Sequence, residues 1–282
     1  MTATPINKSF INFEDDFTRE SFTKVLKTLS TNNKYIMPFL HFDILHKQKL
    51  MIKIEKVNEY GSIKDLIYKS SAMNSYGKKY QPSKGKALNL SLVSIYGRQI
   101  LEALVYLHRN KWYHMHIHTG NVLLDENGEE IRLSGLEIFV NDLPIRNEHV
   151  MNYAFENFNG NNFHISQAKP NNNSSILTDI FKNTYNIFEK IDIISFGRLV
   201  YEMAFGKELK APFPDNLEYQ DMEAGLAEVL RLIFYKKESK INTNFMYSVP
   251  QVTASELLKL KFFDSNKEDE ENKSKFFYYL FR

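Results

Sequence analysis

Residues 92–137 read LVSIYGRQILEALVYLHRNKWYHMHIHTGNVLLDENGEEIRLSGLE, and the organisation of the rest of the chain can be worked out from this segment. Its first part predicts an amphipathic helix, because apolar residues recur mostly at three- and four-residue steps. These residues are Ile95, Ile100, Leu101, Leu104, Val105 and Leu107. A loop rich in histidine follows, and then two short alternating runs flank Asp125–Gly128, whose Asn-Gly pair is a hairpin signal. The segment therefore predicts a helix, a loop and a hairpin in that order.

Composition limits the kind of protein. The 282 residues are 43% hydrophobic and 25% charged, which suffices for one large domain or two lobes around a sizeable core. A net charge of +2 gives no general electrostatic reason to bind nucleic acid or an anionic membrane. The absence of cysteine excludes disulfides, thiolate metal sites and a cysteine nucleophile. We expect a soluble, cytoplasmic protein without a transmembrane segment, because no signal-peptide pattern and no run of about eighteen apolar residues is found.

Upstream of the central segment, residues 17–29 predict a helix with one apolar stripe, formed by Phe22, Val25, Leu26 and Leu29. Two extended runs follow at residues 35–45 and 49–57, and their short connection predicts a hairpin. Residues 1–13 give no firm element. Ser62, with Asp65 three residues later, has the spacing of a helix N-cap.

Residues 70–91 are rich in Ser, Gly, Lys and Asn, which predicts a loop before the central helix. Aromatic and basic side chains alternate in this loop and would also suit nucleic-acid binding; they are Tyr76, Lys78, Lys79, Tyr80, Lys84 and Lys86. We favour a solvated surface loop, because no stacking platform or long basic face accompanies them.

Downstream, residues 138–185 are polar and Asn-rich, so we expect an irregular segment of which part is mobile. Residues 188–206 predict a strongly apolar helix that ends at Gly206, and residues 221–235 predict another helix. Thr253 and Glu256 have the spacing of a capping box. The charge run NKEDEENKSK, residues 266–275, predicts a solvated tail or surface turn, and the aromatic tail, residues 276–281, follows it.

The order and spacing of these segments resemble a protein kinase. His114-Met115-His116, with Asn121 five residues beyond His116, occupies the frame of the kinase catalytic loop, which reads His-Arg-Asp and then Asn. Residues 59–67 resemble the kinase hinge and the start of the next helix. Residues 188–206 resemble the large central helix of the C-lobe. The resemblance implies that Asp192 on this helix accepts hydrogen bonds from the backbone of the catalytic loop.

The resemblance implies an α+β, protein-kinase-like fold with a mainly helical C-lobe and a truncated small N-lobe sheet. Residues 1–58 would form the reduced N-lobe, a helix plus short strands, and residues 59–69 the hinge and following helix. Residues 70–282 would form the helical C-lobe, with a degenerate catalytic loop and a partly mobile, activation-like segment at about 140–185. The HxHTGNVLLD loop and the Gly135-Leu136-Glu137 triplet look most like the divergent branch that contains the Slowpoke-binding protein and the PX-domain-containing kinase-like protein.

Several parts that phosphoryl transfer needs are absent from the sequence. Kinases cover the phosphates with a glycine-rich loop and hold them with a strand lysine. The short stretch before the first predicted helix contains no glycine, and Lys8 is its only lysine. His116 stands where the family has the catalytic aspartate, and His118 stands where serine/threonine kinases have a lysine. Histidine can accept a proton near neutral pH, so the loss of the aspartate is not decisive by itself.

The magnesium ligand of the kinase Asp-Phe-Gly triplet is the more serious loss. The strand alternation maps the triplet onto Gly135-Leu136-Glu137, whereas the ungapped count gives Ser134-Gly135-Leu136. Neither register places a carboxylate in the first position. Asn121 keeps its family position, but a neutral amide alone does not hold Mg²⁺ against water. We therefore expect no cofactor, no metal and no catalytic residue among these degenerate positions.

His114, His116 and His118 allow two interpretations. At alternate positions of an extended segment they would share one face and could bind zinc. In the kinase frame they lie on a loop, with the first histidine packed inward and the others partly exposed. We favour the structural interpretation, because no cysteine is present to complete a zinc site.

The leading functional hypothesis is a catalytically inactive, kinase-like scaffold or regulatory protein that binds other proteins. The resemblance implies partners such as the cytoplasmic region of a potassium channel or a phosphoserine-binding adaptor, and it does not imply nucleic acid. One alternative is a residual or unconventional phosphotransferase that uses His116, Asn121 and Glu137. Another is a switch that binds a nucleotide without turning it over.

Overall fold

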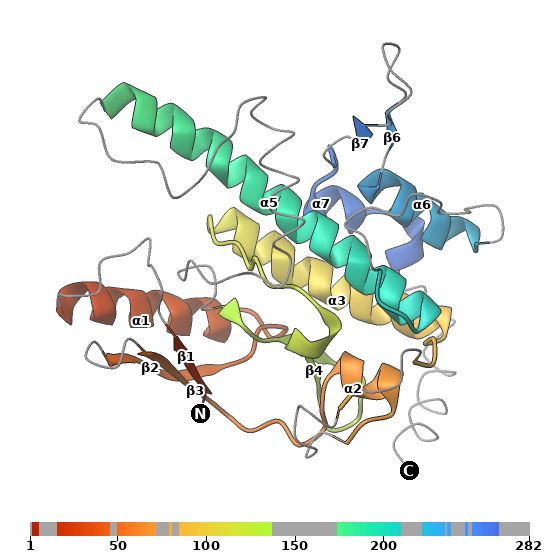
Figure 1. Ribbon diagram of the computed structural model, residues 1–282, viewed down its shortest axis with the longest axis horizontal. Coiled ribbons are helices and arrows are strands. Elements are labelled where there is room, and N and C mark those ends of the chain that lie inside the picture. The colour runs from red at the N-terminus through yellow and green to blue at the C-terminus, as the bar shows by residue number, and fades with distance from the viewer. Residues whose placement is uncertain are drawn as a thin grey trace.

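Helix α3 (Leu90–Arg109) lies at the centre of the molecule, between the long helix α5 (Ser174–Phe205) and the strands β4 (Val122–Leu124) and β5 (Ile131–Leu133) (Figure 1). These two strands follow the histidine-rich loop of residues 110–118, which we call the histidine loop. The computed structural model describes residues 2–5, 16–45, 50–71, 79–80, 85–136, 174–209, 222–234, 236–237, 246–247 and 250–264. Asn89 caps α3 by accepting a hydrogen bond from the backbone of Leu92. Among the described residues, α3 alone is long and apolar enough to cross a membrane, but it is packed against α5, α7 and β5 as a core helix.

The hairpin predicted after α3 is present. Strands β4 (Val122–Leu124) and β5 (Ile131–Leu133) pair antiparallel, and their turn contains Gly128 at a φ of 70°. This left-handed conformation is the one that the Asn-Gly signal predicts. The Tyr96 hydroxyl donates to the Gly128 carbonyl, and the Gln99 side chain bonds the backbone of Glu129 and Ile131. Helix α3 therefore holds the hairpin, and through it the loop that precedes the hairpin.

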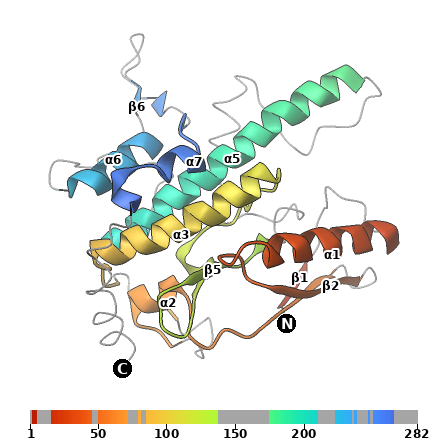
Figure 2. The same ribbon diagram turned by 180° about the vertical axis from the view of Figure 1, so that it is seen from behind.

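The N-terminal part combines a sheet with one helix. Strand β3 (Leu50–Glu55) lies between β1 (Thr2–Pro5) and β2 (Phe39–Leu45), and all pairs are antiparallel. Helix α1 (Asp16–Thr31) contacts β2, and Figure 2 shows this helix and sheet together at one side of α3. The two predicted extended runs are confirmed with shorter bounds.

Two details of the N-terminal prediction are wrong. Residues 2–5 form a strand, although no firm element was predicted in residues 1–13, because the strand is defined by backbone pairing with β3 rather than by a pattern of its own. Val25 does not belong to the buried stripe of α1: its side chain is 43% exposed, whereas Leu26 and Leu29 are buried. The helix touches the sheet along a narrower line than the apolar pattern suggested.

Both predicted capping boxes are confirmed. Ser62 caps α2 (Ile63–Tyr68), and its side chain and that of Asp65 bond each other's backbone N–H groups. Thr253 and Glu256 do the same at α7 (Ala254–Leu257), which is followed by the 3₁₀ turn η7 (Lys261–Phe263). Such caps depend on spacing within one turn, so they can be predicted without knowledge of the tertiary structure.

Helix α5 (Ser174–Phe205) ends, as predicted, before Gly206, which has a φ of 65°. It begins much earlier than the expected residue 188, because residues 174–185 were predicted to be irregular and are helical. Once the buried part of α5 is formed, each added residue gains a backbone hydrogen bond without a new nucleation cost. The rest of the Asn-rich segment, residues 138–173, lies outside the described residues.

The remaining elements follow α5 in the sequence. Helix α6 (Ala224–Ile233) packs on α5 and is shorter than the predicted range of 221–235, and the short strands β6 (Lys236–Lys237) and β7 (Met246–Tyr247) pair with each other. The expectation of a mixed fold of helices and strands is confirmed. The boundaries expected for the hinge and the two lobes stay predictions.

Candidate functional site

The histidine loop lies between the end of α3 and the 3₁₀ turn η3 (Thr119–Asn121), directly before β4. The residues after β5 return to this loop, because the backbone N–H of Ser134 donates to the carbonyl of Asn121 at 2.9 Å. The degenerate catalytic loop and the degenerate metal triplet are therefore neighbours, as their kinase counterparts would be.

Asp192 on α5 is fully buried beneath the histidine loop. Its carboxylate accepts hydrogen bonds from the backbone N–H groups of His114 at 2.8 Å and Met115 at 2.7 Å. A ring nitrogen of His108, in the last turn of α3, lies 3.0 Å from the same carboxylate. These are the loop contacts that the resemblance implies for Asp192, and they satisfy backbone donors that would otherwise be buried without partners.

His114 is buried and both ring nitrogens have partners. Nδ1 accepts from the backbone N–H of His116 at 3.2 Å, and Nε2 lies 2.9 Å from the carbonyl of Ser134. The pair of bonds is satisfied by the neutral tautomer with its proton on Nε2, which donates to the carbonyl. His114 thus joins the loop to the triplet as a structural residue.

Asn121 directs its side-chain amide at the loop itself. Nδ2 donates to the carbonyl of His116 at 2.9 Å and lies 3.2 Å from Nδ1 of the same histidine. A Cβ on Gly135, whose φ is 95°, would approach this amide nitrogen to 2.9 Å, so the triplet passes close to Asn121 only because residue 135 is glycine. The fold therefore brings His116 and Asn121 together. Their polar groups bond each other.

His118 caps the turn that follows it, since Nδ1 accepts from the backbone N–H of Gly120 at 3.1 Å. Its ring meets that of His116 edge-on, with centroids 4.7 Å apart. No group of three or more His, Cys, Asp or Glu residues suitable for a metal ion occurs among the described residues. His114 is committed to Ser134, so the zinc interpretation gains no support.

In the metal triplet, Ser134, Gly135 and Leu136 are described and Glu137 lies outside the described residues. Leu136 is buried in the core. Lys8, the only lysine before α1, also lies outside the described residues. In the described part of the triplet, the position that a kinase fills with a metal-binding carboxylate is occupied by Ser134 or Gly135.

A cavity of about 510 Å³ opens beside the histidine loop, between η3 and α2. Of the described residues that line it, Asp65 alone carries a carboxylate, and this group is bound by Lys79 at 2.9 Å and by the Tyr80 hydroxyl at 2.8 Å. Burial by itself raises the pKa of Asp65, but hydrogen bonds from Lys79, Ser62 and Tyr80 outweigh it and hold the pKa below its ordinary value.

The bonds to Asp65 also bear on the aromatic-basic loop. Lys79 and Tyr80 are tied to α2, while Tyr76, Lys78 and Lys84 lie outside the described residues. Lys79 and Tyr80 therefore serve an intramolecular contact, whereas Lys86, the third described member of that pattern, is exposed.

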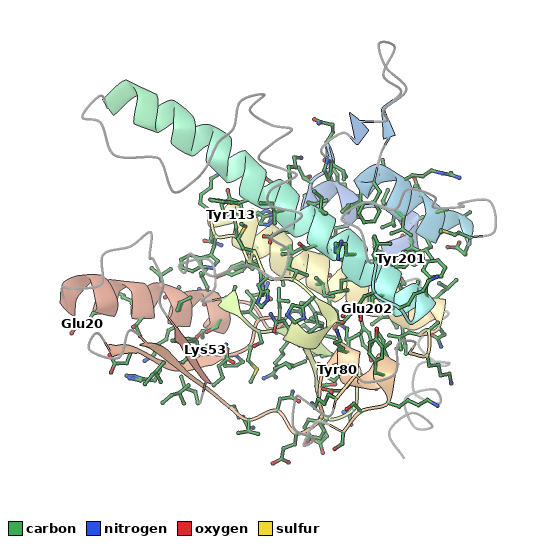
Figure 3. The ribbon with its side chains drawn as sticks, in the orientation of Figure 1. Glu20, Lys53, Tyr80, Tyr113, Tyr201 and Glu202 are labelled. Atoms are coloured by element: carbon green, nitrogen blue, oxygen red, sulfur yellow. The ribbon has the colours of Figure 1, made fainter. Side chains whose placement is uncertain are left out.

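A buried cluster of charges between α2 and α5 was not identified from the sequence. The Lys64 ammonium group is almost fully buried, pairs with Glu208 and lies 3.9 Å from Glu202. It also lies 5.0 Å from the centroid of the Tyr80 ring, a cation–π distance. Tyr80 and Glu202 are labelled in Figure 3. The Thr119 hydroxyl donates to Glu202 at 2.7 Å, so the cluster supports the turn after the histidine loop.

Burial raises the pKa of the Glu202 carboxyl above its ordinary value, although the Thr119 hydrogen bond and the Lys64 charge act in the opposite direction. The signal that could have drawn attention to this residue is its position as a lone carboxylate in the apolar run LVYEMAFG. Its partner could not be found in the same way, because Lys64 is far away in the sequence.

A second buried pair was also missed, on strand β3. Lys53 is 5% exposed and its ammonium group lies 3.0 Å from the Glu55 carboxylate. The Ser134 hydroxyl approaches Glu55 at 3.4 Å, so the pair connects β3 with the degenerate triplet (Figure 3). The partial alternation of Leu50–Glu55 favours the isoleucines as the inward residues, whereas the structure buries Lys53 and leaves Ile52 and Ile54 half-buried.

No family model matches the chain. The Slowpoke-binding protein of Drosophila melanogaster is 34% identical over 227 residues, which is 79% of this chain and 38% of that protein. The PX domain-containing protein kinase-like protein of Mus musculus is 36% identical over 155 residues, 55% of this chain and 22% of that protein. A probable inactive serine/threonine-protein kinase, slob2, of Dictyostelium discoideum is 26% identical over 277 residues, 95% of this chain and 39% of that protein. The chain thus spans well under half the length of each of these relatives.

Proposed function

The chain belongs to a divergent pseudokinase branch of the protein-kinase-like proteins, and on this premise we propose that it acts as a non-catalytic scaffold or regulatory module that binds other proteins. The observation that carries the proposal is the arrangement of Asn121 and the triplet. The side-chain amide nitrogen of Asn121 contacts the carbonyl and ring of His116. Neither Ser134 nor Gly135 carries a carboxylate that could bind a metal beside it. Mg²⁺ bound with ATP requires carboxylate oxygens at this point, so the phosphates would keep their charge uncompensated.

The finer features of the proposal concern lobes, location and partners. We propose that α1 and the sheet β1-β3-β2 form a reduced small lobe and that the protein works in the cytoplasm. By analogy with the Slowpoke-binding protein, the proposed partners are the cytoplasmic region of a potassium channel and a phosphoserine-binding adaptor. The proposed contact surfaces are the exposed C-terminal helices and the aromatic tail, residues 276–281.

Thermal unfolding with ATP, with and without Mg²⁺, tests the absence of nucleotide chemistry. The expected result is the same melting temperature in buffer, in ATP and in ATP with Mg²⁺, while an active protein kinase measured in parallel is stabilised. The variant Asn121→Asp supplies a carboxylate at the loop and serves as the matched comparison. A magnesium-dependent rise in the melting temperature of the unaltered chain would refute the proposal and favour a nucleotide-binding switch or a residual phosphotransferase.

Binding to partners is tested separately, by titrating the purified cytoplasmic region of a potassium channel into the chain in a calorimeter. Saturable heat is expected. The absence of heat would remove the channel as a partner, whatever the nucleotide experiment shows.

A further inference from the structure

An apolar groove lies where α2 meets the start of α3. It has a volume of about 590 Å³, and the side chains that give it its apolar character are Tyr60, Leu66, Leu88 and Leu92. Tyr60 is 48% exposed, and Leu90, next to the lining residue Asn89, is 37% exposed. Both views show α2 beside the first turns of α3 (Figures 1 and 2). We refer to this feature as the α2–α3 groove.

The charges at this groove are predominantly basic. Lys69 and Lys86 line it and are exposed, and no printed ion pair within the described residues engages either ammonium group. Asp65 also lines the groove, but its carboxylate is already bound by Lys79, Tyr80 and Ser62. An occupant with an apolar part and a neighbouring acidic part therefore fits this surface.

The end of the chain has both parts, separated by residues 272–275, whose two lysines leave residues 268–275 with a net charge of −2. Residues 268–271 read EDEE, and residues 276–281 read FFYYLF. Six consecutive apolar and aromatic side chains in water would expose a large apolar surface. Such a segment is therefore more stable against an apolar surface. The aromatic tail needs an apolar surface to cover it, and the α2–α3 groove offers one.

The chain leaves the described residues close to the groove. Its last described residue is Asp264, and the Phe263 carbonyl directly before it accepts from Arg98 on α3 at 2.9 Å. Arg98 is six residues beyond Leu92 of the groove, which is about 9 Å along a helix. The twelve residues from Asp264 to Phe276 can extend to about 40 Å, so the tail reaches the groove without strain.

We propose that the aromatic tail, residues 276–281, binds in the α2–α3 groove of the same chain, with the acidic run 268–271 beside Lys69 and Lys86. This inference goes beyond the proposed scaffold function and does not depend on whether a nucleotide binds. It implies that a partner which binds the aromatic tail, as proposed above, competes with the groove for it.

Because the chain contains no cysteine, an introduced pair of cysteines reports the contact cleanly. The test variant carries Ala87→Cys in the groove and Ser274→Cys just before the aromatic tail. The control variant carries Lys259→Cys instead of Ala87→Cys, on an exposed site of the chain that also lies near Asp264. The rate of intramolecular disulfide formation under mild oxidation is measured for both, at low protein concentration.

The test pair is expected to form its disulfide at least about tenfold faster than the control pair, because docking raises the effective concentration of the two thiols. Adding Lys69→Glu and Lys86→Glu to the test pair is expected to slow the reaction, with an unchanged urea midpoint. Equal rates for the test and control pairs would overturn the proposal. Disulfide-linked dimers in place of the monomeric product would also overturn it, since they assign the groove to a second copy. An unchanged rate after charge reversal would overturn its ionic part.

Discussion

Replacing Asp192 by asparagine removes one anionic oxygen from a fully buried position and puts an NH₂ group in its place. One oxygen of Asp192 serves Met115, and the other serves His114 and His108. In either orientation of the amide, at least one backbone N–H then faces another donor and loses its partner. Under the proposed non-catalytic role, this change should appear as a loss of stability.

The magnitude follows from the number of bonds broken. A buried donor left unsatisfied costs about 1–3 kcal/mol, and one or two such donors arise here, so Asp192→Asn should lose about 1–6 kcal/mol of unfolding free energy. At about 2–4 °C per kcal/mol, a loss in the middle of that range, about 3 kcal/mol, corresponds to a fall of about 6–12 °C in melting temperature. Urea unfolding, followed by fluorescence and by circular dichroism, measures the loss.

The matched control is Asp264→Asn, because Asp264 is exposed and its substitution should change stability by less than about 0.5 kcal/mol. A loss below about 1 kcal/mol for Asp192→Asn would refute the reasoning, since it would mean that the loop donors find other partners at little cost.

Three further predictions concern packing and pH. Gly97→Ala should destabilise the chain by about 1–3 kcal/mol in urea unfolding, because a Cβ there would lie 2.6 Å from the Phe263 ring; an unchanged midpoint would contradict the close packing of α3 on η7. The pKa of Asp65 is lowered in the folded chain, so its stabilisation is present above its ordinary pKa and is lost as pH falls through the lower, folded value. Asp65→Asn should therefore be less stable at pH 7 and lose less of its stability than the unaltered chain on acidification; parallel midpoint-versus-pH curves would contradict this. The pKa of Glu202 is raised in the folded chain, so its contribution to stability falls as pH rises from its ordinary pKa through the folded value. Glu202→Gln should remove that decline, and a decline that persists in the variant must have another source.

Local features could be predicted because their physical causes are local. The two capping boxes, the Asn-Gly hairpin and the end of α5 at Gly206 each depend on residues within one turn. The kinase-like recognition, confirmed by the relatives, also rested on local order and spacing. Where a prediction needed a neighbour from elsewhere in the chain, it was wrong or absent: Val25 on α1 is exposed, and the strand of residues 2–5 exists only through its pairing with β3.

In the candidate site, too, the residue types could be predicted from the sequence and their contacts could not. The residue types were fixed by the sequence alone: histidine at position 116, asparagine at 121, and no carboxylate at 134 or 135. These identities were enough to predict a pseudokinase. What they do in the fold, such as the turning of the Asn121 amide onto His116, could not be read from them.

The partners of the buried charges were decided by the tertiary structure alone. Lys64 meets Glu202 and Glu208, which are far from it in the sequence. Lys53 is buried beside Glu55 of the same strand, where β3 comes close to Ser134. The reason is physical: a charge enters the interior only where a partner is already held to receive it, and the partner's position is set by how α2, α5 and β3 pack together.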